Sequence, residues 1–363
     1  MGWVAISGPG AGAMAARGAA PAGSLLRAAG PAELAGRGTL LIEAELGAVD
    51  ALTALVDIPV RHPVSGRLSL WLGPEGLLTL ELVRGGRQRR ATLTLPTRDR
   101  AEVLRFVFSW DCGTGGARLV VERPERDGAP LAAALADPVA LPLEGLSRAV
   151  LQPTPEILDA RVDFIALSDS IEPIGPMPGL AGGTCVDTPE GRRAVEDLRR
   201  GDLVLIRGEG AVPVLAAVRR SLPARGLFRP VQLFAPHHGL SRDVVVGAGQ
   251  RLVTSGEEVR RLFRAESVLV AARHMIAEGS GIYADSGPLV TLHQLLLPDQ
   301  QVLGICGAEM ESLHVGRLRR SAALVEASLL AGYQRSRLPQ QEGHALPVLR
   351  DYEARMLASH RAA

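Results

Sequence analysis

Cysteine and histidine are the side chains of this protein best suited to act as nucleophiles, bases or metal ligands. The 363-residue chain has three cysteines and eight histidines. Cys112, Cys185 and Cys306 are too few and too widely spaced for a disulfide framework or a zinc site. His237 and His238 are adjacent, but no third metal ligand accompanies them, so we expect neither a metal nor a cofactor. The sequence has no nucleophile elbow, HExxH motif or phosphate loop, which argues against an ordinary hydrolase.

Composition narrows the chemistry further, because the chain contains no lysine and no asparagine. All 40 basic residues are arginine, so there is no lysine for a Schiff base and no asparagine that could cyclise. A formal net charge of +1 and an aromatic content of 3% give little drive toward nucleic acid or anionic membranes. No apolar run reaches the roughly 20 residues of a membrane helix. The length favours two domains, and the 47% apolar content is typical of a folded protein.

Short alternating runs predict that the first half is an antiparallel β-sandwich. Residues 1–37 are rich in alanine and glycine and are expected to form a flexible lead. Across residues 38–170, runs of about six to nine residues alternate apolar and polar side chains and end at Gly, Pro or Asp. These runs lie at 39–46, 66–73, 76–83, 90–97, 103–111, 117–124 and 158–169. Gly85 and Gly86 separate two of them as a predicted hairpin turn.

The second half begins after a linker rich in proline and glycine at residues 171–183. A second β-rich block is expected at 184–318, followed by a helical tail at 319–363. Within the tail, residues 321–333 and 347–360 carry apolar side chains at the three- and four-residue spacing of amphipathic helices. The predicted fold class is therefore mostly β, with an N-terminal sandwich, a second all-β module and C-terminal α-helices.

The first half resembles the concanavalin-like or laminin-G-like sandwiches in one local pattern. A strand ends in Trp110-Asp111, a glycine turn follows, and the next strand carries Glu122. Such sandwiches often bind sugars through carboxylates, amides and aromatic rings. The resemblance implies Trp71, Trp110, Asp111 and Glu122 as binding residues, and a glycan or a cell-surface protein as the partner. The alternative is that both tryptophans are core or strand-pair residues.

A more specific series of motifs occupies residues 183–210, with the sequence GTCVDTPEGRRAVEDLRRGDLVLIRGEG. A Gly-Thr turn leads into a strand, residues 188–191 make a tight turn, and residues 195–198 form a short helical turn before a further strand. This order resembles the opening of the Hint (hedgehog/intein) fold, in the proteobacterial family of two-part proteins that carry this module. The resemblance continues through residues 272–279 and 311–316 to the closing helices.

The resemblance implies self-cleavage chemistry, whose residues can be checked one by one. Hint modules use a cysteine or serine at the first position of the fold to attack the preceding peptide carbonyl. A Thr-x-x-His element polarises that carbonyl and protonates the leaving amine. In this chain the nucleophile position is Gly179, the hydroxyl position is Gly247 and the histidine position is Gln250. Two further family histidines align with Gln294 and Gln300. Glycine cannot attack, and glutamine cannot shuttle a proton at neutral pH.

We therefore interpret the second half as a degenerate Hint module that acts as a scaffold or binding protein, and the lost residues argue against enzymatic activity. Two alternatives stay open: autoproteolysis near residue 179 or 185 that releases the sandwich, and glycan binding by the sandwich. In the first alternative, Cys185 is a displaced nucleophile with His274 or His314 as its base. Otherwise Cys185 faces the core and the two histidines are structural.

The sequence does not assign a cellular location. The N-terminus lacks a basic region followed by a continuous apolar stretch, so no cleaved Sec signal is expected. Export by a signal-less route and a cytoplasmic location both stay open.

Overall fold

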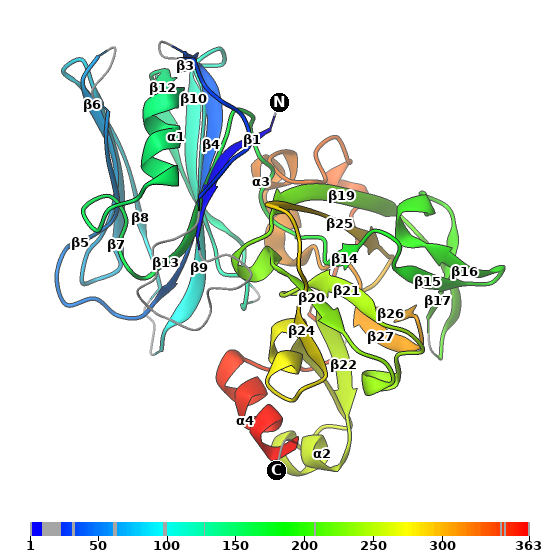
Figure 1. Ribbon diagram of the computed structural model, residues 1–363. Coiled ribbons are helices and arrows are strands. Elements are labelled where there is room, and N and C mark those ends of the chain that lie inside the picture. The colour runs from blue at the N-terminus through cyan, green and yellow to red at the C-terminus, as the bar shows by residue number, and fades with distance from the viewer. Residues whose placement is uncertain are drawn as a thin grey trace. The chain divides into compact units, whose positions relative to one another are not determined.

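The computed structural model describes residues 2–8, 23–30, 33–60, 64–96, 100–126, 128–206, 208–341, 343–344 and 346–361. The chain divides into two compact units, residues 1–174 and 175–363 (Figure 1). Each unit has its own apolar core. The described residues form several antiparallel sheets and a few short helices, which confirms the mostly β fold class expected from the sequence.

The first unit is a β-sandwich of two antiparallel sheets. In its described part, one sheet has seven strands in the order β11-β10-β9-β4-β13-β1-β2, and the other has four in the order β5-β6-β7-β8. The strands of the larger sheet are β1 (Trp3–Ser7), β2 (Ser24–Leu25), β4 (Arg37–Leu46), β9 (Glu102–Asp111), β10 (Gly116–Glu122), β11 (Leu131–Ala136) and β13 (Val162–Ser168). The strands of the smaller sheet are β5 (Thr53–Val60), β6 (Gly66–Leu72), β7 (Leu77–Arg84) and β8 (Arg87–Thr94). Strands β3 (Leu34–Ala35) and β12 (Leu141–Pro142) pair separately, and helix α1 (Leu143–Leu151) follows β12.

Apolar side chains from the two sheets meet in one core. The larger sheet contributes Phe106, Phe108 and Trp110, and the smaller sheet contributes Leu70 and Leu80, each at most 1% exposed. Phe106, Phe108 and Trp110 are two apart along β9 because successive side chains of a strand point to opposite faces. Full burial of such a side chain contributes about 1.5–3 kcal/mol, so the alternation read from the sequence is what specifies the sandwich.

The N-terminal residues correct one expectation. The flexible lead predicted for residues 1–37 is wrong for Trp3–Ser7, which forms the buried strand β1 between β13 and β2. All five residues of this strand are buried, so it lacks the polar alternation that identified the other strands. The same expectation for residues 9–22 lies outside the described residues. The hairpin turn between β7 and β8 is confirmed, with φ of +54° at Gly85 and +75° at Gly86.

The second unit is built on two further antiparallel sheets (Figure 1). In its described part, one sheet has six strands in the order β19-β25-β14-β21-β20-β24. Their bounds are β14 (Leu180–Ala181), β19 (Ala216–Pro223), β20 (Pro230–Leu233), β21 (Val244–Gly247), β24 (Gly281–Tyr283) and β25 (Leu289–Leu296). The eight-stranded sheet follows the order β16-β15-β26-β27-β22-β23, and β17 and β18 pair beside β26. Their bounds are β15 (Cys185–Thr188), β16 (Gly191–Ala194), β17 (Leu203–Ile206), β18 (Gly210–Pro213), β22 (Arg251–Ser255), β23 (Ser267–Ala271), β26 (Val302–Ile305) and β27 (Ala308–Glu311).

The short local motifs of this unit form as the sequence predicts. Thr188 pairs with Gly191 across the tight turn between β15 and β16. The helical turn that follows is the 3-10 helix η1 (Val195–Asp197). Further 3-10 helices occur at η2 (Gly226–Phe228), η3 (His237–Gly239), η4 (Ala272–Ile276), η5 (Gly316–Arg320) and η6 (Arg335–Arg337).

The C-terminal helices are shorter than the sequence predicts. The helix expected at 321–333 is only α3 (Ala322–Glu326), because Ser328 turns the chain out of it. Ser328 Oγ donates to the Val325 carbonyl at 2.7 Å and accepts from the Leu330 N–H at 3.1 Å, bonds that compete with continued helix. The second expected helix is α4 (Asp351–Arg361), which packs beside α2 (Glu257–Phe263) (Figure 1).

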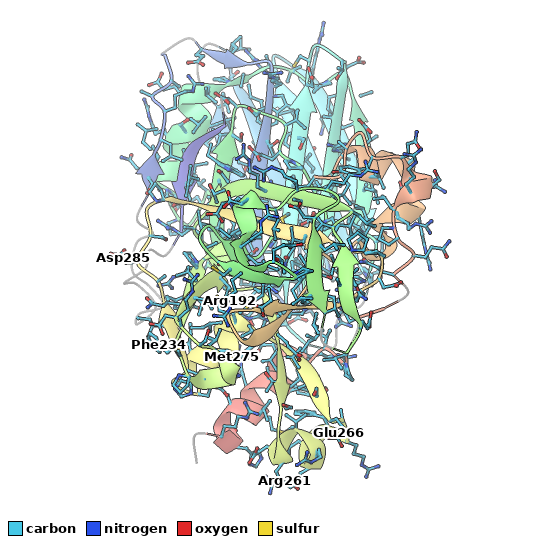
Figure 2. All side chains as sticks on the ribbon, turned by 90° about the vertical axis from the view of Figure 1, so that its right-hand side faces the viewer. Arg192, Phe234, Arg261, Glu266, Met275 and Asp285 are labelled. Atoms are coloured by element: carbon cyan, nitrogen blue, oxygen red, sulfur yellow. The ribbon has the colours of Figure 1, made fainter. Side chains whose placement is uncertain are left out.

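Helix α2 and the loop after it carry charged residues at exposed positions, among them Arg261 and Glu266 (Figure 2). A hydrogen bond links helix α4 to the end of strand β22, since Arg361 Nη2 donates to the Ser255 carbonyl at 2.7 Å. In the described part of the chain, no helix has both the length and the apolar character needed to cross a membrane.

Candidate functional site

Gly179 lies at the start of the six-stranded sheet, where the Hint resemblance places the nucleophile. It immediately precedes β14, and its N–H donates to the His293 carbonyl at 3.2 Å. The Gly247 N–H donates to the Gly179 carbonyl at 2.8 Å. Main-chain hydrogen bonds therefore hold residue 179 between β25 and β21.

Gln250 fills the space into which a side chain on residue 179 would project. A Cβ atom on Gly179 would lie 2.1 Å from Gln250 Oε1 and 3.0 Å from Gln250 Cβ. Ordinary non-bonded contacts are about 3.5–4.0 Å, so Gln250 and any side chain on residue 179 exclude one another. Gly247 is also confined, because a Cβ there would lie 3.0 Å from Leu292 Cδ1.

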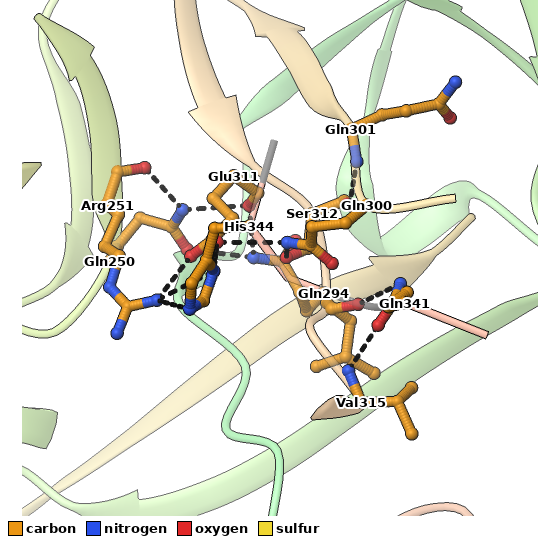
Figure 3. A network of polar contacts seen from close by, with 11 residues as sticks. Gln250, Arg251, Gln294, Gln300, Gln301, Glu311, Ser312, Val315, Gln341 and His344 are labelled. Carbon is orange, nitrogen blue, oxygen red and sulfur yellow. Dashed lines mark hydrogen bonds and ion pairs between the residues drawn. The ribbon is translucent and has the colours of Figure 1, made fainter. Parts of the chain in front are cut away.

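The side-chain amides of Gln250 and Gln294 form one hydrogen-bond network (Figure 3). Gln294 Nε2 donates to Gln250 Oε1 at 2.9 Å and to the Glu311 carbonyl at 3.1 Å. Gln250 Nε2 donates to the carbonyls of Arg251 and Glu311, both at 3.0 Å. Gln294 Oε1 accepts from the Leu295 N–H at 3.2 Å. Every polar side-chain atom of the two glutamines has a partner.

The three glutamines that stand at family histidine positions converge on Glu311 at the end of β27 (Figure 3). Gln250 and Gln294 both bind its carbonyl oxygen. Gln300 Nε2 donates to its carboxylate Oε1 at 3.0 Å. Residues that are far apart in the sequence are thus joined through one buried acidic residue, which is 7% exposed.

The Glu311 carboxylate is held in its ionised form by two basic side chains. Arg251 Nη1 lies 3.2 Å from Oε2, and His344 Nδ1 contacts Oε1. Burial acts to raise the pKa of Glu311, but the hydrogen bond to His344 and the charge of Arg251 outweigh it and leave the pKa below its ordinary value. The His314 ring packs against His344 with ring centroids 4.1 Å apart, which places His314 beside this charged cluster.

Sequence reasoning missed Glu311, Arg251 and His344 as members of this site. A signal existed for the first two, because Arg251 follows the Gln250 position directly and Glu311 begins the quoted 311–316 motif. His344 lies in the tail, outside every motif, and only the fold brings it to the site.

Cys185 and His274, one of the two histidines proposed as its bases, each contact other groups. In the described part of the chain, the Cys185 thiol hydrogen-bonds with the Gly183 carbonyl at 3.9 Å and with Arg242 Nη2 at 2.9 Å. His274 is 8% exposed and lies 3.5 Å from Asp351 of α4. Burial, reinforced by neighbouring arginine charges, lowers the pKa of His274 to about 4, which leaves it neutral at pH 7.

The four residues proposed for glycan binding fall in different environments of the sandwich. Trp110 is 1% exposed and donates from Nε1 to the Ala35 carbonyl at 3.0 Å. Glu122 is 5% exposed and accepts from Arg105 Nη1 at 3.0 Å. Asp111 caps the β9–β10 turn by accepting from a backbone N–H at 2.8 Å, and Trp71 is half-buried on β6.

A cleft in the first unit lies beside one of these residues. It has a volume of about 290 Å³ and is lined by charged side chains that include Arg27, Arg37 and Asp169. Arg27 lies 3.1 Å from Asp169, so part of this charge is internally compensated. Ala35, whose carbonyl accepts the hydrogen bond from Trp110 Nε1, also lines the cleft.

Residues 178–317 match the family model described as the Hint domain. The matched segment begins one residue before Gly179 and ends just after the His314 position, so it covers both sheets of the second unit. The second unit of this protein is a Hint domain, as the motifs at 183–210, 272–279 and 311–316 predicted.

Three solved structures illustrate what the chain is similar to. The CBM40 of the Ruminococcus gnavus IT-sialidase, solved with alpha2,6 sialyllactose, is 9% identical, with a TM-score of 0.24 over 37% of this chain and 77% of that chain. The enzymatically active domain of bacteriophage CBA120 tailspike protein 2 is 12% identical, with a TM-score of 0.23 over 40% of this chain and 21% of that chain. The LG1-3 region of the laminin alpha2 chain is 10% identical, with a TM-score of 0.25 over 87% of this chain and 56% of that chain. The last two are therefore spanned over less than two thirds of their length. No curated protein matches the sequence.

Proposed function

We propose that the second unit is a Hint domain without self-cleavage, which serves as a scaffold for the N-terminal sandwich. The observation that carries the proposal is the 2.1 Å separation between Gln250 Oε1 and a Cβ on residue 179. Gly179 has no side chain with which to attack. A nucleophile could stand at this position only if Gln250 left its hydrogen-bond network.

The groups that would move protons in a cleaving Hint domain are also replaced. An amide neither takes up nor releases a proton near neutral pH, so Gln250, Gln294 and Gln300 cannot act as general acids or bases. Both N–H groups of Gln250 are engaged by the carbonyls of Arg251 and Glu311. None remains to polarise the peptide bond that precedes residue 179.

A displaced attack by Cys185 is the alternative, and its surroundings argue against it. Cys185 belongs to the eight-stranded sheet, whereas Gly179 leads into the six-stranded sheet. A misplacement of one ångström already costs a reaction about a hundredfold in rate, and Cys185 is six residues from the position that the fold presents. His274 faces Asp351 rather than this thiol.

The test is the intact mass of the full chain after incubation with a thiol and, separately, with hydroxylamine. We expect a single species of 38.3 kDa under both conditions. Two fragments with a new N-terminus at residue 179 or 185 would refute the proposal. If such fragments disappeared in the Cys185→Ala variant, the nucleophile would be the displaced cysteine.

Matched variants separate a missing nucleophile from a missing proton relay. Gly179→Cys alone should not cleave, because its side chain meets Gln250 and no base is supplied. Gly179→Cys combined with Gln250→His and Gly247→Thr restores the three residue types that the family uses. Cleavage by the single variant would contradict the proposal, since it would mean that the amide network leaves room for attack.

We infer a second function, ligand binding by the sandwich, from the cleft that Arg27, Arg37 and Asp169 line. Two arginines face two carboxylates there, Glu33 and Asp169, and such a charged lining favours a polar small ligand over an apolar one. Retention of the full chain on a glycan array tests this. Retention that is lost in Arg37→Ala and kept in Trp71→Ala would support the cleft, and the reverse would support the sequence-predicted binding residue instead. No retention on any glycan would contradict glycan binding altogether.

A further inference from the structure

Two of the three cysteines flank one strand pair of the eight-stranded sheet. Cys185 is the first residue of β15, and Cys306 directly follows β26 in the turn to β27. The two strands pair antiparallel through Val186 and Ile305, so both cysteines lie at the same end of this pair. Disulfides need Cα atoms about 4.4–6.8 Å apart, a range that includes the roughly 4.5–5.5 Å typical of opposed residues at such a pair.

The side chain of Cys306 reaches the Cys185 residue directly. Cys306 has a φ of +50° in the turn, and its Sγ lies 3.6 Å from the Cys185 carbonyl oxygen. On the other side of the Val186–Ile305 pair, a Cβ on Gly304 would lie 2.6 Å from Asp187 Oδ2, so positions 187 and 304 share a face. Side chains alternate along a strand, which returns Cys185 to that face.

The guanidinium of Arg242 hydrogen-bonds to both thiols. Arg242 Nη2 donates to Cys185 Sγ at 2.9 Å and to the Gly183 carbonyl at 2.9 Å. A hydrogen bond to the Cys306 thiol, followed by the charges of Cys306 and Cys185, raises the pKa of Arg242. The Arg242 guanidinium therefore contacts both sulfur-bearing side chains, which places the two cysteines around one basic group. Asp187, the acidic residue on this face, is paired with Arg192 at 3.2 Å (the Arg192 position is marked in Figure 2).

We propose that Cys185 and Cys306 are a redox-active thiol pair, which a hydroperoxide oxidises to an intramolecular disulfide. Cys185 is half-buried and reacts first, because Cys306 is 0% exposed. Cys306 then acts as the resolving thiol. The product links β15, at the beginning of the Hint domain, to the turn between β26 and β27.

The chemistry balances with hydrogen peroxide as the oxidant. The Cys185 thiolate attacks one peroxide oxygen, the O–O bond breaks, and the departing hydroxide takes a proton and becomes water. This leaves a sulfenic acid on Cys185. The Cys306 sulfur then attacks that sulfur, the S–S bond forms, the S–O bond breaks, and the hydroxide leaves as water with the Cys306 proton. Two thiols lose two electrons in all, and one peroxide becomes two molecules of water.

Cys112 of the first unit is a matched internal control. It is half-buried like Cys185, but burial raises the pKa of its thiol and the nearby Asp111 adds to the effect. Its thiol hydrogen-bonds to the Pro138 carbonyl at 3.4 Å and not to a basic side chain. The proposal therefore expects Cys112 to stay reduced under conditions that oxidise the pair.

The test uses the full chain, reduced and then exposed to hydrogen peroxide in small molar excess. Differential alkylation and peptide mapping should find one Cys185–Cys306 disulfide, a loss of two hydrogens from the intact mass, and a free Cys112. Equal oxidation of all three thiols, or oxidation of Cys185 without a disulfide, would overturn the proposal.

Variants of the three participating residues make the order of steps visible. Cys306→Ser should trap the sulfenic acid on Cys185, detected by its dimedone adduct, while Cys185→Ser should prevent oxidation of Cys306. Arg242→Gln should slow disulfide formation by about three- to tenfold, because it removes the charge-assisted hydrogen bond to sulfur. An unchanged rate in Arg242→Gln, or a dimedone adduct on Cys306 rather than Cys185, would contradict the assigned roles.

Discussion

A side chain on residue 179 and the side chain of Gln250 should exclude one another, and this competition can be measured as a coupling energy. The perturbation is Gly179→Ala, which adds one methyl group 2.1 Å from Gln250 Oε1. Gly179 does not have a left-handed backbone conformation, so alanine meets no backbone penalty there. Any loss of stability then reports the steric conflict alone.

The expected magnitude follows from the hydrogen bonds that Gln250 would have to give up. Relief of the contact requires the amide to move by more than an ångström, which breaks its bonds to Gln294, Arg251 and Glu311. Each buried polar group left without a partner costs about 1–3 kcal/mol. We therefore expect Gly179→Ala to lower the unfolding free energy of the second unit by about 2–4 kcal/mol.

The double variant distinguishes steric exclusion from a general defect. Gln250→Ala alone should cost a comparable amount, because the carbonyls of Arg251 and Glu311 lose a donor. In Gly179→Ala/Gln250→Ala the 2.1 Å contact is gone and only the 3.0 Å contact with the Cβ of residue 250 is left, which a small shift relieves. The double variant should therefore be only slightly less stable than Gln250→Ala. The coupling energy should then be about 2 kcal/mol or more, at the upper end of values for residues in contact.

The assay must follow the unfolding of the second unit, and the positions of the tryptophans and cysteines in the sequence determine which probe does so. All three tryptophans, Trp3, Trp71 and Trp110, belong to the first unit, so their fluorescence does not follow the unfolding of the Hint domain. Pulsed alkylation of Cys306, which is 0% exposed, in urea under reducing conditions does follow it. Additivity of the two substitutions within about 0.5 kcal/mol would refute the reasoning.

The remaining predictions concern buried charges. Burial and two neighbouring glutamates raise the pKa of Asp163 to about 7, so the folded first unit binds this proton more tightly than the unfolded chain. That unit should lose up to about 4 kcal/mol of stability as pH rises from about 4 to 7, and Asp163→Asn should remove the slope in urea titrations followed by tryptophan fluorescence. The opposite sign holds for His274, whose lowered pKa of about 4 means that the unfolded chain is protonated first. The second unit should lose up to about 3 kcal/mol as pH falls from about 6.5 to 4, and His274→Gln should flatten this loss in the Cys306 assay. Arg105→Met should cost the first unit about 3–5 kcal/mol by tryptophan fluorescence, because it removes the positive charge that two buried glutamates share.

Each of these substitutions has its control in the other unit. Asp163→Asn should leave the pH dependence of the Hint domain unchanged, and His274→Gln should leave that of the sandwich unchanged. A slope that persists in either variant would show that other groups titrate in its place. A near-neutral Arg105→Met would mean that Glu43 and Glu122 are solvated or protonated after the substitution.

Local sequence signals predicted seven strands of the sandwich and the short turns, because both depend on neighbouring residues. The alternation in β7 and β8 and the double glycine after Arg84 were sufficient for that hairpin. Strand β1 was not predicted, because a strand that is buried on both faces shows no alternation of apolar and polar side chains. The helix expected at 321–333 failed because a hydroxyl at Ser328 bonds locally, a competition that periodicity does not record.

The candidate site likewise has features that local sequence signals predict and features that depend on long-range packing. The motif spacing located Gly179, Gln250 and Gln294, since each lies in a short conspicuous segment. The sequence could not show that Gln250 fills the space next to Gly179, or that His344 from the tail reaches Glu311. Both facts require strands distant in the chain to be packed together, and that packing is set by the core rather than by the residues of the site.

The amide network also explains how a fold built around a strained reaction centre can persist without the reaction. A proton relay works only if some donors and acceptors are left for the substrate, and such buried unpaired groups are costly. Gln250 and Gln294 remove that cost, because all their polar atoms are satisfied within the protein. The same bonds engage the donors that a scissile carbonyl would need. The proposed loss of cleavage and the fully hydrogen-bonded interior therefore have the same structural cause, and restoring cleavage would require residues 179, 247 and 250 to change together.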